Sequence, residues 1–381
     1  MAGIELAQAD FALLMAPPRV TAALPGIGGR IRARPEDFSV REVPSYGADG
    51  TADSHLLLTL RKRLLTTEDA IREVARGCGI PRSEFGVAGL KDRNAVTEQQ
   101  ISAPATAAAA LAAFRHPQIE LGPAEPHSHK LRRGHLRANL FELTIRALAA
   151  PIDTAEDRLR AKLAALEAAG GLDNLYGAQR FGAEGRNIHR GLSLLAEGAR
   201  RRRKADFLVS AGQSALFNLY VLERRERGLT RTVLEGDVLK KVGSGGLFVC
   251  SDPALDQERF DAGEIELTGP IFGGKMKAPP TGTPSAELES AILDRVGLAR
   301  SALSALGKKV PGTRRPCQLF PGELRFQRAP TVELASQGEP PHIPSLLPEG
   351  LRVDFRLPSG SYATQLTHEI QGPTDDVSLA P

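Results

Sequence analysis

The chain has 381 residues, 41% of them hydrophobic and 25% charged, a composition ordinary for a globular protein that is long enough for two domains. Its three cysteines are widely spaced and no apolar run approaches the ~20 residues of a membrane span, which excludes a disulfide scaffold and a membrane-spanning protein. Lys and Arg number 49 against 45 Asp and Glu, a net charge of +4, so the distribution of basic residues is more informative than their total.

The first third of the chain contains mainly strand patterns. In "PEDFSVREV", Phe38 and Val40 alternate with polar residues, which predicts a strand, and "SHLLLTLRKR" predicts its partner. A helix is predicted from Thr66, a good N-cap, to the glycines at 77 and 79. "FGVAG" and "AVTEQQIS" predict short strands on either side of a charged turn, and "APATAAAALAAF" predicts a further helix.

The rest of the chain changes character after Gly171. Before it, "NLFELTIRAL" predicts a strand and a helix starts at Asp153 or Thr154. After it, glycine, arginine and amides dominate, with helices predicted in "SAGQSALFNLYVLERRERG" and "SAELESAILDRVG". A proline-rich connection at 340–348 leads to a final strand containing Phe355, and the tail is expected to fray. The pattern predicts an α+β fold whose core is split by an inserted domain.

The charged turn is Lys91-Asp92-Arg93, directly after one short strand and before another. A structural role would account for Asp92, because Asp in turns often bonds its own backbone. A functional role is also consistent, because cations on both sides keep a carboxylate ionised, and turns at strand ends project side chains into clefts. The turn alone leaves both interpretations open.

Basic residues recur in several clusters between residues 130 and 203. Each cluster alone is typical of a solvated surface. Joined by glycine and asparagine, with Phe and Tyr interleaved, they favour a surface that follows a polyanion, with cations on phosphates and an aromatic ring on a displaced base. The residues predicted to contact RNA are Lys130, Arg132, Arg133, Arg180 and Arg186. The same clusters also contain Arg137, Arg190 and Arg200–Arg203.

No metal or cofactor is predicted. His127, His129 and His135 match no familiar ligand spacing, have basic neighbours and no nearby cysteine, so phosphate contact or packing is favoured. "GSGG" at 243–246 lacks the lysine and serine of a phosphate loop. No motif for a nicotinamide, a flavin or nucleotide hydrolysis is found. The N-terminus lacks a leader pattern, so a cytoplasmic protein is expected.

Six segments resemble, in order, blocks of the tRNA pseudouridine synthase D (TruD) family. The segment "GLKDRNAVTEQ" resembles the family's catalytic motif. The other five are "RPEDFSVREV", "HKLRRGHLRANLFELTI", "NLYGAQRFGAEGRNI", "SAGQSALFN" and "LPSGSYAT". Together they span residues 30 to 370, so the resemblance covers nearly the whole chain. One such block would be weak, whereas six in order are specific.

The resemblance implies a pseudouridine synthase core with a mixed, largely antiparallel sheet, interrupted by an inserted α/β TRUD-type domain. The expected division is 1–170 for the first part of the core, 171–320 for the insertion and 321–381 for the final part. By the same resemblance Asp92 is the catalytic aspartate. The positions expected to bind the target nucleotide are Phe38, Asn139, Tyr362, Lys91 and Phe141.

The implied reaction breaks the bond from C1′ of ribose to uracil N1, turns the base and rejoins it through C5. It is redox-neutral and has no second substrate, which agrees with the missing cofactor motifs. A carboxylate either attacks C1′ or removes the C2′ proton, and both routes need an ionised Asp92. Phe38 and Tyr362 can stack on the everted base, and the Asn139 amide can read its edge.

The expected function is therefore isomerisation of uridine in tRNA, in this family typically at uridine 13. One alternative is a non-catalytic RNA-binding or chaperone protein of the same fold. Another is a hydrolytic glycosidase, which needs a second carboxylate, for which Glu98 and Glu36 are the nearby candidates. The expected partner is tRNA, with no protein partner and no membrane implied.

Overall fold

The computed structural model describes residues 4–51, 54–197, 205–333 and 346–373. The basic run at 200–204, most of the proline-rich connection and the tail lie outside these residues. The chain forms two compact units. The sheet unit comprises Ala23–Ala164, Pro321–Ala363 and Thr367–Pro381; the helical unit comprises Met1–Ala22, Ala165–Phe320 and Thr364–Leu366. Within the described ranges, no helix has the length and apolar character needed to cross a bilayer.

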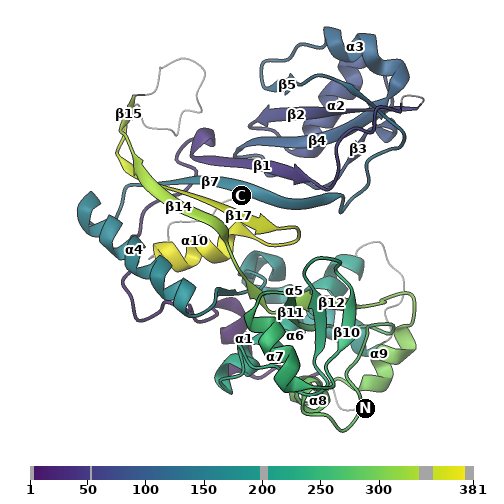
Figure 1. The fold of residues 1–381 in the computed structure, drawn as a ribbon, viewed down its shortest axis with the longest axis vertical. Helices are drawn as coiled ribbons and strands as arrows, with labels where there is room; N and C mark the ends of the chain where they lie inside the picture. The colour runs from purple at the N-terminus through teal and green to yellow at the C-terminus, as the bar shows by residue number, and fades with distance from the viewer. Residues whose placement is uncertain (1–3, 52–53, 198–204, 334–345, 374–381) are drawn as a thin grey trace. The chain divides into compact units, whose positions relative to one another are not determined.

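The sheet unit is built on a nine-stranded sheet in the order β14-β17-β7-β1-β4-β2-β5, with β3 beside β4 and β6 beside β2 (Figure 1). Only the β1–β4 pair is parallel among these described strands, which confirms the predicted α+β fold with a mixed, largely antiparallel sheet. The strands are β1 (Phe38–Pro44), β2 (His55–Arg63), β3 (Gly86–Val87), β4 (Val96–Pro104), β5 (Ile119–Leu121), β6 (Glu125–His127), β7 (Leu136–Arg146), β14 (Gly322–Ala329) and β17 (Gly350–Pro358).

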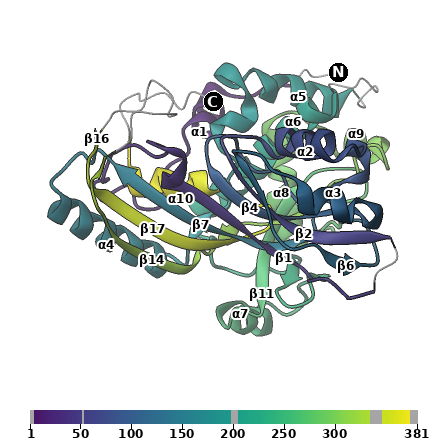
Figure 2. The same cartoon turned by 90° about the horizontal axis from the view of Figure 1, so that it is seen from above.

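Helix α2 (Thr67–Cys78) covers part of one face of this sheet, with α3 (Ala108–Ala113) beside it (Figure 1 and Figure 2). As predicted, Thr66 caps α2 by accepting a hydrogen bond from the Asp69 amide (3.0 Å). The apolar stripe of α2, including Ile71 and Val74, packs on Leu60 of β2. Each such side chain contributes about 1.5–3 kcal/mol on burial. Helices α4 (Ile152–Ala168) and α10 (Ala363–Gln371) begin in the sheet unit.

The helical unit surrounds α6 (Ala205–Glu226), whose buried side chains form the centre of its apolar core. Helix α5 (Arg186–Ala196) approaches it so closely that a Cβ on Gly191 would lie 2.2 Å from the Leu208 carbonyl oxygen. A four-stranded sheet packs nearby, in the order β10 (Leu247–Val249), β9 (Val238–Lys241), β11 (Ile265–Ile271) and β12 (Thr313–Pro316). The remaining helices are α1 (Gln8–Met15), α7 (Pro253–Asp261), α8 (Pro284–Arg295) and α9 (Arg300–Leu306), and β8 (Leu172–Asp173) pairs with β13 (Gln318–Leu319).

The N-terminal residues, predicted as part of the core, are contained in the helical unit. Leu14 is fully buried in its apolar cluster, and the Arg295 guanidinium donates to the buried Asp10 carboxylate (2.8 Å). The pattern of this short segment could not reveal that attachment, because its partner lies far along the chain.

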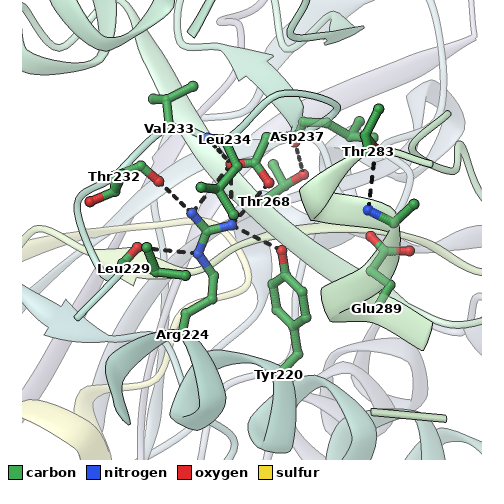
Figure 3. Close-up of polar contacts among 12 residues, drawn as sticks. Tyr220, Arg224, Leu229, Thr232, Val233, Leu234, Asp237, Thr268, Thr283 and Glu289 are labelled. Atoms are coloured by element: carbon green, nitrogen blue, oxygen red, sulfur yellow. Dashed lines mark hydrogen bonds and ion pairs between the residues drawn. The ribbon is translucent and has the colours of Figure 1, made fainter. Parts of the chain in front are cut away.

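A buried polar network fixes the end of α6 (Figure 3). The Arg224 guanidinium donates to both Asp237 oxygens, to the Tyr220 hydroxyl (3.1 Å) and to the Thr232 carbonyl (2.5 Å). Arg224 and Asp237 are 2% and 1% exposed. A buried charge pair needs such complete hydrogen bonding to offset its desolvation. The network therefore holds the loop after α6 in one conformation and is structural.

Candidate active site

The pairing of five strands determines which side chains share the face of the sheet on which the Asp92 loop lies. Residues directly opposite one another in a sheet point to the same side. One such row consists of Lys62 of β2, Thr97 of β4, Val40 of β1, Phe141 of β7 and Phe355 of β17. Phe38, Glu42, Gln99 and Asn139 lie two residues away along their strands and point to the same side. We call this side the site face.

The Asp92 loop, residues 89–94, is held in place by hydrogen bonds at Gly89 and Lys91. The Lys91 ammonium donates to the Glu42 carboxylate at 2.7 Å, and these side chains are 6% and 0% exposed. The side-chain amide of Gln99 donates to the Gly89 carbonyl (3.0 Å). The backbone amide of Lys91 donates to the Thr67 hydroxyl (2.8 Å) at the start of α2. Lys91, predicted to bind the substrate, is thus engaged inside the protein, where it fixes the loop.

Lys62 of β2 binds the backbone of Asp92, the residue after Lys91 in the loop. Its ammonium donates to the Asp92 carbonyl (2.7 Å) and to the Leu65 carbonyl (2.5 Å), and the residue is 1% exposed. Burial lowers the pKa of Lys62 to about 8, while the nearby Asp92 carboxylate opposes the shift. The backbone of the predicted catalytic residue is therefore held by a buried cation.

The Asp92 side chain reaches the surface beside Phe38. Its carboxylate accepts a hydrogen bond from the Arg32 guanidinium (2.6 Å), which also lies 4.1 Å from the centroid of the Phe38 ring. Arg32 has φ of 59°, a left-handed conformation rare for a residue with a side chain. The Asp92 side chain is 65% exposed, so the described residues of the sheet unit do not enclose it. The carboxylate is thus oriented on one side and open to a substrate on the other.

Three aromatic rings pack in a row on the site face. Phe38 meets Phe141 edge to face at 6.4 Å, and Phe141 stacks on Phe355 at 5.1 Å. Phe38 and Phe141 are 5% and 8% exposed. The structure brings these two predicted pocket residues together, but a base that stacks on Phe38 requires the Arg32 guanidinium to shift.

Asn139 and Tyr362 come from neighbouring segments. Asn139 is paired with Leu357 of β17, and its side-chain oxygen is buried without a hydrogen-bond partner among the described residues. Buried acceptors are rarely left unpaired, so this oxygen suits a ligand donor. Tyr362 follows β17, opens α10 and is 42% exposed. That β17 would return beside β7 is not visible from local sequence patterns.

The residues predicted to contact RNA are divided between the units. Arg132 and Arg133 are exposed in the turn before β7, and the Lys130 ammonium donates to the Ser83 carbonyl. In the helical unit, Arg180 donates to the hydroxyls of Ser210 and Ser214. Arg186 is exposed and lies 3.5 Å from Glu184. RNA contact by each of these residues stays a prediction.

The three histidines pack around Tyr46. The Tyr46 ring stacks on His127 at 5.4 Å, and its hydroxyl lies 2.5 Å from His135 Nδ1 and 3.2 Å from His129 Nε2. His127 and His129 also share a cluster with Asp49, in which one possible ligand atom from each lies within 4.8 Å of the others. Burial lowers the pKa of His127, so its ring is held neutral. The Asp49 carboxylate and His129 are already hydrogen-bonded by Ser128, which is consistent with packing, one of the two roles predicted for these histidines.

Several supporting residues were not identified from the sequence. Lys62 continues the alternation of Leu58 and Leu60 in β2, so a charged residue at an inward position was a usable signal. Glu42 likewise follows Phe38 and Val40 in β1 at a spacing of two. No local pattern could have paired Arg32 with Asp92, because 60 residues separate them.

Comparisons with known proteins agree with the sequence motifs. A family model described as tRNA pseudouridine synthase D (TruD) matches residues 19–201 and 201–370. A protein named tRNA pseudouridine synthase D from Anaeromyxobacter sp. (strain Fw109-5) is 41% identical over 362 residues, 93% of this chain and 95% of the relative. A protein of the same name from Thermus thermophilus is 38% identical over 356 residues, covering 93% of this chain and 91% of the relative. A crystal structure from Methanosarcina mazei, named TruD, shares the fold with a TM-score of 0.73 at 21% identity, covering 97% of this chain and 98% of that chain.

Proposed function

Because this chain belongs to the tRNA pseudouridine synthase D family, we propose that it converts uridine to pseudouridine in tRNA, at uridine 13, with Asp92 acting on the ribose. The observation that carries this proposal is the setting of Asp92. Its backbone is held by the buried Lys62, and its carboxylate is oriented by Arg32 beside the Phe38 ring, with its outer side open. A macromolecular substrate can reach such a carboxylate, whereas an enclosed one would admit only a small molecule.

The chemistry requires that the target nucleotide first leaves its stack, at a cost of a few kcal/mol. Stacking on an aromatic ring returns ~1–3 kcal/mol per base. Phe38 and Tyr362 are the rings that we assign to this role. The unpaired oxygen of Asn139 is suited to accept the N3–H of uracil. Phe141 supports Phe38 from within the sheet.

In the reacting complex, the Asp92 carboxylate either bonds to C1′ as N1 departs or removes the C2′ proton. The uracil anion then turns and forms the new bond from C5 to C1′. On the first route this bond displaces the Asp92 carboxylate from C1′, and on the second route the protonated Asp92 side chain returns its proton to C2′. The proton on C5 is lost and N1 gains one, so atoms and charge balance without an external reagent. The bound RNA covers the exposed carboxylate and excludes water, which protects the activated sugar from hydrolysis.

A tritium-release assay tests the proposed reaction. Uridine labelled at C5 loses its tritium when C5 bonds to C1′, so purified protein should release tritium from tRNA in proportion to the pseudouridine formed at uridine 13. Binding without release would indicate a non-catalytic RNA-binding protein instead. Free uracil would indicate a glycosidase, although Glu36, one candidate for its second carboxylate, is ion-paired with Arg63 at 2.7 Å.

Binding of tRNA should weaken steeply with added salt. If the five predicted cations each neutralise one phosphate, log Kd should rise with log salt concentration with a slope of about 4, since each contact contributes ~0.7–0.9. The residues concerned are Lys130, Arg132, Arg133, Arg180 and Arg186. Fluorescence anisotropy with labelled tRNA at several salt concentrations measures the slope. A flat response would show that these residues do not neutralise phosphates of the tRNA.

The rate of pseudouridine formation should fall as pH rises through about 8, where Lys62 loses its proton and its bond to the Asp92 carbonyl is no longer charge-assisted. The charges that act on Lys62 are those of Asp92, Lys91, Arg93 and Asp69. Single-turnover rates measured from about pH 6 to about pH 9.5 give the dependence of the rate on pH on both sides of this pKa.

Lys62→Arg keeps its charge at every pH tested, because guanidinium titrates above ~12. This variant should therefore not show the fall in rate at alkaline pH, the alkaline limb of the profile. Unfolding does not explain such a limb. Between about 8 and the unfolded value of 10.5, the unfolded chain binds more protons at Lys62 than the folded protein does, so this group makes folding more favourable as pH rises. An identical limb in wild type and Lys62→Arg would rule out this role. Lys62→Met, which lacks the donor, should slow the reaction at all pH values.

A further inference from the structure

A groove of about 1030 Å³ lies at the end of β2 and β5 in the sheet unit. Three segments form its walls: residues 61–63 of β2, Ala112 of α3 with the residues 114–118 that follow this helix, and residues 119–123 in and after β5. Figure 1 shows β2, β5 and α3 gathered at this end of the sheet. The volume is at the upper limit of small-ligand pockets, which are typically ~300–1,000 Å³.

The groove adjoins the Asp92 loop through two of its lining residues. Lys62 lines it and donates to the Asp92 carbonyl. Val96, another lining residue, is the first residue of β4 after the loop. Glu36 lies at the same end, two residues before Phe38. An occupant of the groove would therefore lie next to a nucleotide held at Asp92.

The groove is basic. Four basic side chains line it: Arg61, Lys62, Arg63 and Arg115. The two carboxylates of the lining are both ion-paired, Glu36 with Arg63 at 2.7 Å and Glu120 with Arg61 at 3.3 Å. Arg115 is different. Its guanidinium donates to the carbonyls of Ala112 and Phe114, and no carboxylate lies within ion-pair distance of it among the described residues. An exposed cation of this kind suits a phosphate.

The substrate chemistry explains why such a groove is needed. A nucleotide turned out of its stack stays covalently joined to both neighbours, so the strand must leave the site in two directions. We infer that this groove binds the ribose-phosphate backbone of the tRNA strand next to the target uridine, with Arg115 on a phosphate. The inference rests on the proposed function. Phe114 and His116, stacked at 6.2 Å, form one wall along which a flanking base can pack.

The test compares Arg115→Gln with Arg325→Gln. Arg115→Gln removes the charge but keeps a donor for the backbone carbonyls. Arg325 is an exposed arginine on β14, the opposite edge of the sheet order. For Arg115→Gln, tRNA should bind severalfold more weakly at low salt and the slope of log Kd against log salt concentration should fall by about 0.7–0.9. The rate at saturating tRNA should be unchanged.

Arg325→Gln should match the wild type in affinity and slope. If Arg115→Gln also matches it while wild type forms pseudouridine normally, the groove inference is wrong and the proposed function stands. If wild type binds tRNA but releases no tritium, the proposed function fails, and the change in slope still reports on the groove separately.

Discussion

Asp92→Asn is expected to abolish pseudouridine formation while leaving the fold and tRNA binding intact. Asn has the same shape, but its amide neither attacks C1′ nor accepts a proton from C2′. The loss should be on the order of 10³-fold or more, as for other enzymes that lose a nucleophile or base. Since the side chain is 65% exposed, its replacement removes little packing. Single-turnover conversion with saturating enzyme measures the chemical step, and anisotropy measures binding.

Glu98→Gln is the matched control. Glu98 lies on β4 between Thr97 and Gln99 and therefore points away from the site face. Its variant should convert uridine at the wild-type rate. A substantial rate with Asp92→Asn would show that the carboxylate has been assigned wrongly, and a loss confined to Glu98→Gln would assign the catalytic role to Glu98 instead.

Glu42→Leu should destabilise the protein by about 3 kcal/mol. The change leaves the Lys91 ammonium, 6% exposed, without its carboxylate partner, and breaking a buried pair typically costs ~3–5 kcal/mol. The lower end is expected because Lys91 keeps a little contact with water. The backbone N–H of Gln100 also loses an acceptor, since it donates to the same carboxylate at 3.3 Å. Urea unfolding, with equal m-values as a check, measures the difference.

The double variant Glu42→Leu/Lys91→Met separates anchoring from substrate binding. Replacing both charges by apolar side chains is often neutral, so stability should return to within about 1 kcal/mol of the wild type. If Lys91 acts only by holding the loop, the double variant should also recover most of the rate. A stable double variant that binds tRNA normally but remains slow would mean that the Lys91 charge acts on the substrate. Unchanged stability in Glu42→Leu alone would contradict the buried-pair description.

Local patterns in the sequence were sufficient for most of the sheet unit. The alternation of Phe38 and Val40 predicted β1, and the cap at Thr66 predicted α2 with its observed start. These elements follow from neighbouring residues, because strand alternation and helix capping act over a few positions. The resemblance to the family supplied the mixed sheet, which alternation alone could not.

What local patterns could not provide was the pairing of distant segments. The ion pair of Arg32 with Asp92 and the bonds from Lys62 to the loop depend on strand order. Lys91 is a second example. A lysine in a charged turn is expected to be exposed, and the sequence does not show that the buried Glu42 carboxylate pairs with it. The turn sequence also could not show that the Asp92 side chain is left 65% exposed by the described residues of the sheet unit.

A crystal structure of Asp92→Asn bound to its tRNA would show whether residue 92 faces the ribose of an everted uridine. One uridine should lie outside the helical stack, with its C1′ and C2′ next to the side chain at position 92. The base should stack on Phe38 or Tyr362, with its edge hydrogen-bonded by Asn139. A complex in which the target uridine remains stacked in the tRNA, or occupies a different surface from residue 92, would contradict the role proposed for Asp92.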